Sequence, residues 1–322
     1  MSDRFPEIEP YRTGLLEVGD GDQVYVEECG NPEGKPALVV HGGPGSGCTP
    51  NQRRAFDPEK YRIILFDQRN CGRSRPHASD PAVDLSANTT EHLIADMELL
   101  RAHLDVDRWL LYGVSWGSTL ALAYTERHPE RVAEVVVAGV TLGRRADIAW
   151  LYQGVGRFFP EEWERFRDTV PAAERGEDVF DLLAGYGRLA RDPDPAVRAR
   201  AVSEWLAWED TVVSMEPQGK PNAYSARPAP NLPAFVRICA HYFSHGCFVD
   251  GEALLARAAR LGDIPAVLVH GRFDLGGPLA AAWELSHTWP GSRLEIIDDS
   301  GHTGSETMGR VVRAVLADFA RA

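Results

Sequence analysis

The sequence WLLYGVSWGSTLALAYTERH, residues 109–128, joins a short apolar run to a helical pattern through a serine between two glycines. Gly113, Ser115 and Gly117 form the pattern Gly-x-Ser-x-Gly, and helical spacing follows over residues 118–127. Glycine on both sides of a serine leaves room for a tight strand-to-helix turn and permits its unusual backbone angles. The pattern therefore predicts a nucleophile elbow, whose helix directs N–H groups toward developing negative charge. The alternative is an ordinary serine in a turn between a strand and a helix.

Short apolar runs alternate with helical patterns on both sides of this turn. Continuous apolar runs are typical of strands that are buried on both faces of a parallel sheet. Strands that alternate with helices predict an α/β fold, and together with the elbow they predict an α/β-hydrolase fold with a mostly parallel, doubly wound sheet. The predicted strands lie within 15–30 and at 37–40, 61–66, 109–112, 132–138, 266–270 and 293–297, and helices are expected at 90–104 and 309–321.

The alternation is interrupted between residues 141 and 260, where no strand pattern is clear. An α/β core that is interrupted in this way is typical of a hydrolase with an inserted cap. We therefore expect a core of residues 1–140 and 261–322 and a helical cap domain of residues 141–260. Helical patterns occur at 160–170, 195–215 and 251–261, whereas 217–233, with five prolines, predicts an irregular connection.

Composition argues against several classes of function. The 322 residues carry a formal net charge of −13, which argues against a nucleic-acid surface. The five cysteines are odd in number and form no C-x-x-C pair, so neither a disulfide framework nor a metal site is expected. The polar start MSDRFPEIEP lacks a secretory pattern, and no apolar run is long enough to span a bilayer. We expect a cytoplasmic protein with no membrane partner, and the sequence does not set its oligomeric state.

Two later strands are followed by the residues that a catalytic serine requires. A serine hydrolase of this fold needs, in chain order, the serine, an acid and a histidine base that the acid orients. Asp274 follows the strand at 266–270 in HGRFD, and His302 follows the strand at 293–297 in DDSGH. Both follow the carboxyl ends of their strands, where parallel sheets build their sites. We predict a triad of Ser115, Asp274 and His302, the alternatives being a turn aspartate and a solvated histidine.

The predicted nucleophile also needs an oxyanion hole with two converging N–H donors. Trp116 follows the serine, so its backbone N–H is one candidate. The loop HGGPG at residues 41–45 follows an earlier strand, and its glycines let the backbone approach a substrate. We therefore predict the N–H of Gly43 as the second donor, with a plain Gly/Pro turn as the alternative.

Several motifs of the chain are narrower than the general hydrolase pattern. They are HGGPG at 41–45, DQR at 67–69 with CGRS at 71–74, SWGSTLAL at 115–122, HPERV at 128–132, HGRFD at 270–274 and SGH at 300–302. Over nearly the whole chain, this set resembles the proline iminopeptidases (prolyl aminopeptidases). The resemblance implies release of an N-terminal amino acid, typically proline, through an acyl-enzyme, without a metal or an organic cofactor. Ser115, Asp274 and His302 match the triad positions of that family.

The resemblance also implies a pocket in which acidic cap residues bind the free ammonium group of the substrate. Residues 205–209 read WLAWE, the family's context for one such acid, so Glu209 is the candidate. On the residues alone, a glutamate on an arginine-rich helix would be solvated. Cys239 stands where the family has a second glutamate, and Thr141 stands where it has an aromatic residue. The predicted substrate-binding set is completed by Tyr152 and Phe243.

These two replacements predict an altered acyl pocket. A hydrogen bond to a charged group contributes about 1.5–3 kcal/mol, so losing one of two acids weakens amine recognition by roughly ten- to a hundredfold. Loss of an aromatic wall weakens the grip on a pyrrolidine ring. We therefore expect a small peptide or aminoacyl amide as substrate, with alanine or glycine preferred to proline. An aminoacyl group on a natural-product amine is also compatible, because some members of the family remove such a group from an amino-polyketide.

Two other functions remain open on this sequence. The same triad would serve an esterase, thioesterase or lactonase, and equal activity on N-blocked and free-amine substrates would favour that class. The chain could instead be a non-catalytic binding protein on this fold, and labelling of Ser115 by a fluorophosphonate would exclude that alternative. An epoxide hydrolase or dehalogenase is disfavoured, because those enzymes need an aspartate at the position of Ser115.

Overall fold

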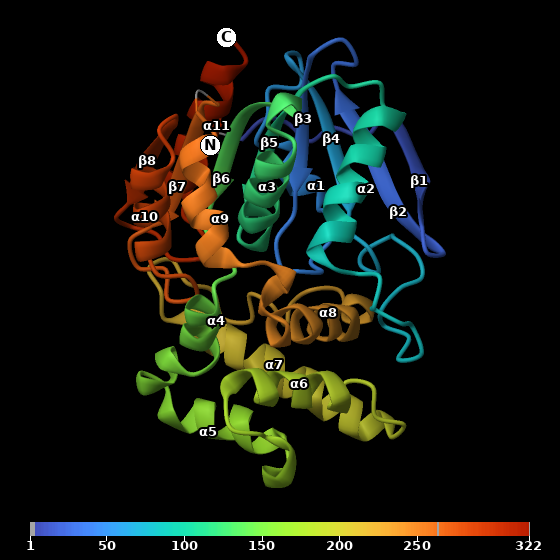
Figure 1. Ribbon diagram of the computed structural model, residues 1–322, viewed down its shortest axis with the longest axis vertical. Helices are drawn as coiled ribbons and strands as arrows, with labels where there is room; N and C mark the ends of the chain where they lie inside the picture. Colours follow the sequence, from blue (N-terminus) through green and yellow to red (C-terminus); the bar gives the residue numbers. More distant parts are fainter. Residues whose placement is uncertain (1–3, 263, 322) are drawn as a thin grey trace.

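One sheet runs through the computed structural model, which describes residues 4–262 and 264–321. Its eight strands follow the order β1-β2-β4-β3-β5-β6-β7-β8 (Figure 1). The pairs β1–β2 and β2–β4 are antiparallel, and the other neighbouring pairs are parallel, as the sequence predicts for most of the sheet. The strands are β1 (Arg12–Gly19), β2 (Asp22–Gly30), β3 (Lys35–Val40), β4 (Tyr61–Asp67), β5 (Trp109–Val114), β6 (Val132–Ala138), β7 (Ala266–Gly271) and β8 (Ser292–Ile297).

The central strands are apolar along their length because their side chains alternate between two cores. In β3, Leu38 and Val40 belong to one core, whereas Ala37 and Val39 belong to the other. Each strand therefore reads as a continuous apolar run. β5 lies between β3 and β6 in the middle of the sheet, so the residue that follows it stands at the centre of the carboxyl edge.

Helices cover both faces of the sheet. The last helix, α11 (Glu306–Phe319), buries Met308, Val312, Val315 and Leu316, whose spacing places them on one side of the helix, and these residues fill the second core. The short α1 (Pro50–Arg53) follows β3. The first core receives side chains from α2 (Thr90–His103), α3 (Trp116–Arg127), α9 (Gly251–Arg257) and α10 (Ala280–Thr288).

A layer of helices lies beyond the carboxyl edge of the sheet (Figure 1). Between β6 and β7, the described residues contain no strand. Aromatic rings pack inside this helical layer: the ring of Phe166 lies 4.5 Å from that of Tyr186 and 5.7 Å from that of Trp208, centroid to centroid. Such rings bury much apolar surface and hold the layer together. Its helices are α4 (Arg145–Tyr152), α5 (Pro160–Thr169), α6 (Val179–Leu189), α7 (Pro195–Ser214) and α8 (Leu232–Ser244).

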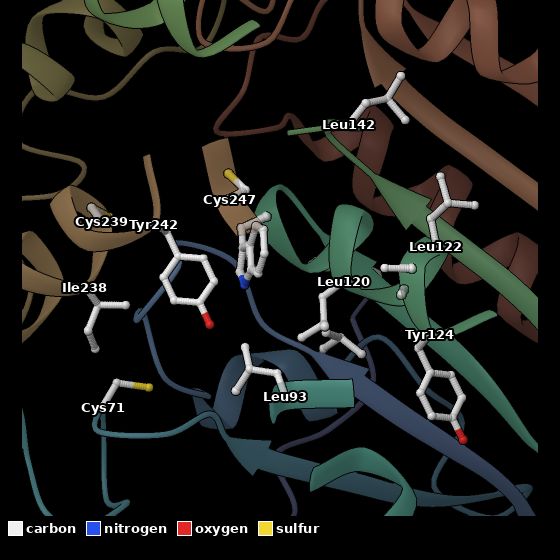
Figure 2. Packing of buried hydrophobic residues seen from close by; sticks show 14 of the residues in the cluster. Cys71, Leu93, Leu120, Leu122, Tyr124, Leu142, Ile238, Cys239, Tyr242 and Cys247 are labelled. Carbon is white, nitrogen blue, oxygen red and sulfur yellow. The ribbon is translucent and has the colours of Figure 1, made fainter. Parts of the chain in front are cut away.

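Helix α8 joins the helical layer to the sheet. Tyr242 of α8 shares a core with Leu93 of α2 and Leu120 of α3, and Figure 2 shows these side chains together. The ring of Tyr242 lies 4.9 Å from that of Trp116 in an edge-to-face arrangement, and its hydroxyl donates to Oδ1 of Asn88 at 2.8 Å. The two parts of the molecule therefore share one continuous core at this helix.

The helical patterns at 90–104, 160–170, 195–215 and 309–321 occur as α2, α5, α7 and α11. The helices α1, α4, α6, α8 and α10 were not predicted. Helix α8 begins at Leu232, inside the segment that we expected to be irregular, and Pro233 fits its first turn because an N–H there has no helical partner. Helix α9 lies inside the predicted insertion but packs against α3 and α10 beside the sheet.

Short 3-10 turns complete the structure. They occur at Pro129–Arg131, Gly154–Arg157, Ala172–Glu174, Ala229–Asn231, Gly246–Phe248 and Ala258–Arg260. The last of these turns continues α9, so the helical pattern expected at 251–261 is a helix followed by a tighter turn. Within the described parts of the chain, none of the helices has both the length and the apolar character needed to cross a bilayer.

Candidate active site

Ser115 occupies a strained turn between β5 and α3. Its backbone angles, φ 54° and ψ −126°, are sparsely populated by residues other than glycine. A Cβ atom on Gly113 would lie 2.4 Å from the carbonyl oxygen of Gly117, and one on Gly117 would lie 2.1 Å from the carbonyl oxygen of Val40. Close backbone contacts therefore require both glycines of the motif, and the turn has the geometry of a nucleophile elbow.

Three side chains are linked in series at the carboxyl edge of the sheet. Nε2 of His302 lies 2.9 Å from Oγ of Ser115, and its Nδ1 lies 2.8 Å from Oδ2 of Asp274. The other carboxylate oxygen, Oδ1 of Asp274, accepts a hydrogen bond from the N–H of Gly277 at 2.6 Å. When the Nδ1–H of His302 faces the carboxylate, Nε2 can accept the serine proton. The structure thus brings together the three residues predicted as a triad.

Opposing effects set the pKa of His302. Burial lowers it, but the charge and hydrogen bond of Asp274 raise it, and the charges of Glu216 and Glu209 add to this increase, so the pKa rises to about 9. Burial also raises the pKa of Asp274, yet the charge and hydrogen bond of His302 hold it below its usual value. A general base acts in its neutral form. Catalysis through His302 is therefore expected to increase as the pH rises toward 9.

The two predicted oxyanion donors lie in segments that one glutamine connects. Gly43 has φ +117°, and a Cβ atom there would lie 2.6 Å from the nitrogen of Gly45, so only glycine fits this loop. Trp116 is the first residue of α3, where an N–H has no partner within the helix. Oε1 of Gln68 accepts from Nε1 of Trp116 at 3.0 Å, and Nε2 of Gln68 donates to the carbonyl of His41 at 2.9 Å. Gln68 of the DQR motif therefore connects the elbow to the HGGPG loop.

A cavity of about 870 Å³ lies between these groups and the helical layer. We call the loops that follow β3, β5, β6, β7 and β8 its floor, and α4, α7, α8 and the connection 215–231 its roof. A volume of this order suits a small-molecule substrate. Among the described residues, no three His, Cys, Asp or Glu side chains are grouped so as to hold a metal ion. The predicted site residues that line the cavity are Gly43, Ser115, Trp116, Thr141, Tyr152, Glu209, Phe243 and His302.

Glu209 on α7 presents a partly satisfied carboxylate to the cavity. Its side chain is buried, and Oε1 accepts hydrogen bonds from the hydroxyl of Tyr152 at 2.6 Å and from Nε1 of Trp205 at 2.8 Å. Burial raises the pKa of Glu209, while these two hydrogen bonds and the charge of Arg227 oppose the increase. Within the described chain, Oε2 receives no such bond. This oxygen is available to a donor on a substrate.

Thr141 and Phe243 form two further parts of the cavity wall. Oγ1 of Thr141 lies 2.9 Å from Oγ1 of Thr119 and 3.1 Å from the carbonyl oxygen of Ser115. A small hydroxyl side chain therefore stands beside the elbow. The ring of Phe243 lies 5.4 Å from that of Tyr152, which ties the aromatic part of the wall to Glu209 through the tyrosine hydroxyl.

Cys239 does not line the cavity, which corrects the expectation that it contacts the substrate. The side chain is fully buried in α8, and its thiol donates to the carbonyl of Pro44 at 3.3 Å. Burial, followed by the charge of Glu209, raises the pKa of this thiol well above its usual value, so it stays protonated and uncharged. A cysteine here packs against the HGGPG loop, and it is too short to place a polar atom in the cavity.

Glu216 is a site residue that the sequence analysis did not identify. It is buried just beyond the end of α7, where Oε1 accepts from the N–H of Leu275 at 2.7 Å and Oε2 accepts from the N–H of His302 at 2.6 Å. Burial and the charge of Asp274 raise the pKa of Glu216 to about 7. No sequence signal marks this residue, because its partners are backbone groups that any residue could supply. It connects the roof to both catalytic loops.

The fold and the linked side chains define the class of the protein. Residues 35–307 match the protein-family model for the alpha/beta hydrolase fold. Solved structures with a similar fold include proline iminopeptidase from Mycobacterium smegmatis, with a TM-score of 0.58 and 19% identity over 96% of this chain and 98% of that chain. An esterase from Exiguobacterium antarcticum has a TM-score of 0.55 and 19% identity over 97% of this chain and 100% of that chain. The chain is a serine hydrolase of the α/β-hydrolase fold.

Curated relatives then identify the family within this class. A probable proline iminopeptidase of Streptomyces coelicolor is 46% identical over 322 residues, which cover 98% of each chain. A proline iminopeptidase of Xylella fastidiosa is 44% identical over 308 residues, which cover 95% of each chain. The chain belongs to the proline iminopeptidase family, which confirms the resemblance noted in the sequence motifs.

Proposed function

We propose that this family member is an aminopeptidase-type amidase whose acyl pocket differs from that of an ordinary proline iminopeptidase. The observation that carries the proposal is the position of Glu209. Glu209 lines the same cavity as Ser115 and His302, and its Oε2 receives no hydrogen bond within the described chain. A buried carboxylate binds an ammonium group strongly, because both partners of the hydrogen bond are charged. A substrate with a free amine can thus be anchored at the roof while its carbonyl lies on the floor.

The proposed reaction follows from the order of groups on the floor. Oγ of Ser115 attacks the carbonyl carbon while Nε2 of His302 takes its proton, and Asp274 stabilises the imidazolium. The N–H groups of Gly43 and Trp116 stabilise the oxyanion. The C–N bond then breaks, and His302 returns the proton to the leaving amine. A water molecule attacks the acyl-enzyme in the same way, which releases the amino acid and restores the serine.

The wall near the elbow supports a substrate other than proline. Thr141 stands beside Ser115 with a polar hydroxyl, so no aromatic ring faces a pyrrolidine there. We propose that alanine or glycine is preferred to proline, either in a small peptide or as an aminoacyl group on a natural-product amine such as an amino-polyketide. We further propose that residues 141–260 act as the cap domain that gives the substrate this pocket.

The test is a matched panel of anilides of Pro, Ala, Gly and Leu, each with a free and an acetylated amine. We expect the free-amine forms to be hydrolysed faster, with Ala or Gly ahead of Pro in kcat/KM. A leading rate on Pro-anilide would show that the changes at Thr141 and Cys239 do not redirect the enzyme. Equal rates on free and acetylated forms would overturn the aminopeptidase proposal and favour an esterase or thioesterase.

A further inference from the structure

A guanidinium that forms neither an ion pair nor a side-chain hydrogen bond within the described chain also lines the cavity. Arg227, in the roof connection, is among its lining residues, and Nη1 of its guanidinium is buried without a hydrogen-bond partner in the described chain. No described carboxylate lies within 4.0 Å of this guanidinium, so it forms no ion pair there. Arg227 as a whole is only partly buried, but a buried N–H donor without a hydrogen bond is unfavourable. The open donor therefore points to a ligand group.

The guanidinium is held in place by aromatic faces, which leave its donors free. Its central carbon lies 4.1 Å from the ring centroid of Phe235 and 4.9 Å from that of Tyr224. The two rings stack on each other with centroids 5.8 Å apart and planes inclined by 22°. Contact with aromatic faces orients an arginine without using its N–H groups.

The connection that carries Arg227 is itself anchored to α7. The N–H groups of Tyr224 and Ser225 both donate to the carboxylate of Asp210, at 2.6 Å and 3.3 Å. Asp210 follows Glu209 directly in the chain, so successive residues of α7 serve two purposes: Glu209 faces the cavity, and Asp210 fixes the turn before the arginine. The positions of the anionic and the cationic group in the roof are thereby linked.

The charge of Arg227 is close enough to influence this end of the cavity. It opposes the increase that burial causes in the pKa of Glu209, and it opposes the corresponding increase for the thiol of Cys239. The resemblance described above places a second acid at the position of Cys239. The roof of this protein instead combines one carboxylate with one guanidinium. A ligand that carries only an ammonium group would leave the guanidinium unpaired.

We propose that Arg227 binds a carboxylate of the substrate, so that the preferred substrate carries both an ammonium and a carboxylate group. This inference rests on the proposed amidase function. The carboxylate can belong to the leaving group, as in a dipeptide with a free C-terminus, or to the side chain of the aminoacyl group, as in an aspartyl amide. Both sources present the same planar anion, which guanidinium donors bind in a bidentate manner.

Two matched substrate pairs test the proposal and separate these sources. Ala-Gly is compared with Ala-Gly-amide, and Asp-anilide is compared with Asn-anilide, in the wild type and in Arg227→Gln. A charge-assisted hydrogen bond corresponds to about a tenfold to hundredfold effect, so we expect one pair to show that preference for the carboxylate form in kcat/KM. Arg227→Gln should reduce this ratio to near one, and Arg227→Lys should restore part of it.

The exposed Lys220, which borders the same cavity, supplies a matched control for loss of one positive charge. Lys220→Gln should keep the ratio of the wild type. The proposal is overturned if neither pair shows a carboxylate preference, if Arg227→Gln keeps the preference, or if Lys220→Gln loses it equally. Hydrolysis of 4-nitrophenyl acetate, which carries neither group, shows that each variant is folded.

A failure of the amidase proposal would be recognised separately. In that case the enzyme would hydrolyse 4-nitrophenyl acetate but none of the aminoacyl substrates. Arg227 would then be tested with the 4-nitrophenyl monoester of glutaric acid against the corresponding glutaramic ester. A preference for the acid that disappears in Arg227→Gln would support the carboxylate site, and equal rates in the wild type would exclude it.

Discussion

The polar groups on the floor of the cavity and those in its roof differ in their hydrogen bonding. On the floor, hydrogen bonds link Ser115 to His302 and His302 to Asp274. The second carboxylate oxygen of Asp274 accepts a hydrogen bond from the N–H of Gly277. In the roof, two charged residues that line the cavity keep polar atoms without a hydrogen-bond partner in the described chain: Oε2 of Glu209 and Nη1 of Arg227.

This difference separates the two tasks of the site. Groups that are already hydrogen-bonded to one another are preorganised, and catalysis of acyl transfer requires such preorganisation. Charged groups with unused hydrogen-bonding capacity can instead discriminate between ligands, because a ligand that lacks the matching group leaves them unpaired. The comparison assigns the reaction to the floor and the choice of substrate to the roof. Three substitutions test that assignment.

The largest effect is expected on the floor. Ser115→Ala removes the nucleophile, so turnover of esters and amides alike should fall by about 10⁶-fold. Rates on both substrate types and labelling by a fluorophosphonate provide the measurement. The variant should keep the melting temperature of the wild type within a few degrees, since only one hydroxyl is lost. Substantial residual hydrolysis that survives repurification would contradict the assignment of Ser115.

A smaller and more selective effect is expected in the roof. Glu209→Gln keeps an oxygen for the donors of Tyr152 and Trp205 but removes the negative charge. Hydrolysis of free-amine substrates should fall by about ten- to a hundredfold in kcat/KM, because a charged hydrogen bond to the ammonium is lost. Activity on 4-nitrophenyl acetate should not fall, because the charge of Glu209 helps raise the pKa of His302 and its loss favours the neutral base. An equal loss on that ester would show that Glu209 supports the floor and would end the separation of tasks.

The smallest effect is expected where floor and roof meet. Above pH 7 the carboxyl of Glu216 is ionised and favours the protonated form of His302, whose pKa is about 9. Glu216→Gln removes this charge, so the pKa of His302 should decrease. The acid limb of the pH profile of kcat/KM should therefore move to lower pH, by up to about one unit.

The control for this variant keeps the charge. Glu216→Asp retains a carboxylate on a shorter side chain. It should weaken the contacts with the two catalytic loops but shift the acid limb of the pH profile less than Glu216→Gln does. A residue that only fixes the position of the loops would reduce kcat without moving the pH profile. An unshifted limb in Glu216→Gln would therefore show that Glu216 acts through position alone.

The floor could be predicted from the sequence because its chemistry lies in short local motifs. Gly113 is required by a contact across the elbow turn, and Gly117 by a contact with Val40 at the end of the neighbouring strand β3. The aspartate and histidine follow strands whose order is set by the fold. The strands themselves are visible because burial on both faces leaves continuous apolar runs.

The roof could be predicted only in part, because its contacts depend on how helices pack. Glu216 binds backbone N–H groups. The rings that contact Arg227 belong to Tyr224, in the same connection, and to Phe235, on the helix α8 that the proline-rich sequence did not predict. For Cys239 the sequence predicted a contact with the cavity that the structure does not contain. Its alignment with a binding residue suggested contact with substrate, but a shorter side chain at the same place is buried against Pro44. The motif thus placed the residue near the site, but it did not show whether the side chain is long enough to enter the cavity.

The bridge from Glu216 to both catalytic loops has a consequence for protein engineering. Exchange of the helical insertion between relatives is an attractive route to new specificity, since the catalytic residues Ser115, Asp274 and His302 all lie outside it. In this protein such a graft would remove the acceptor for the N–H groups of Leu275 and His302. A functional chimera would need to carry a carboxylate at this junction, so the exchangeable module ends before Glu216 or must include a replacement for it.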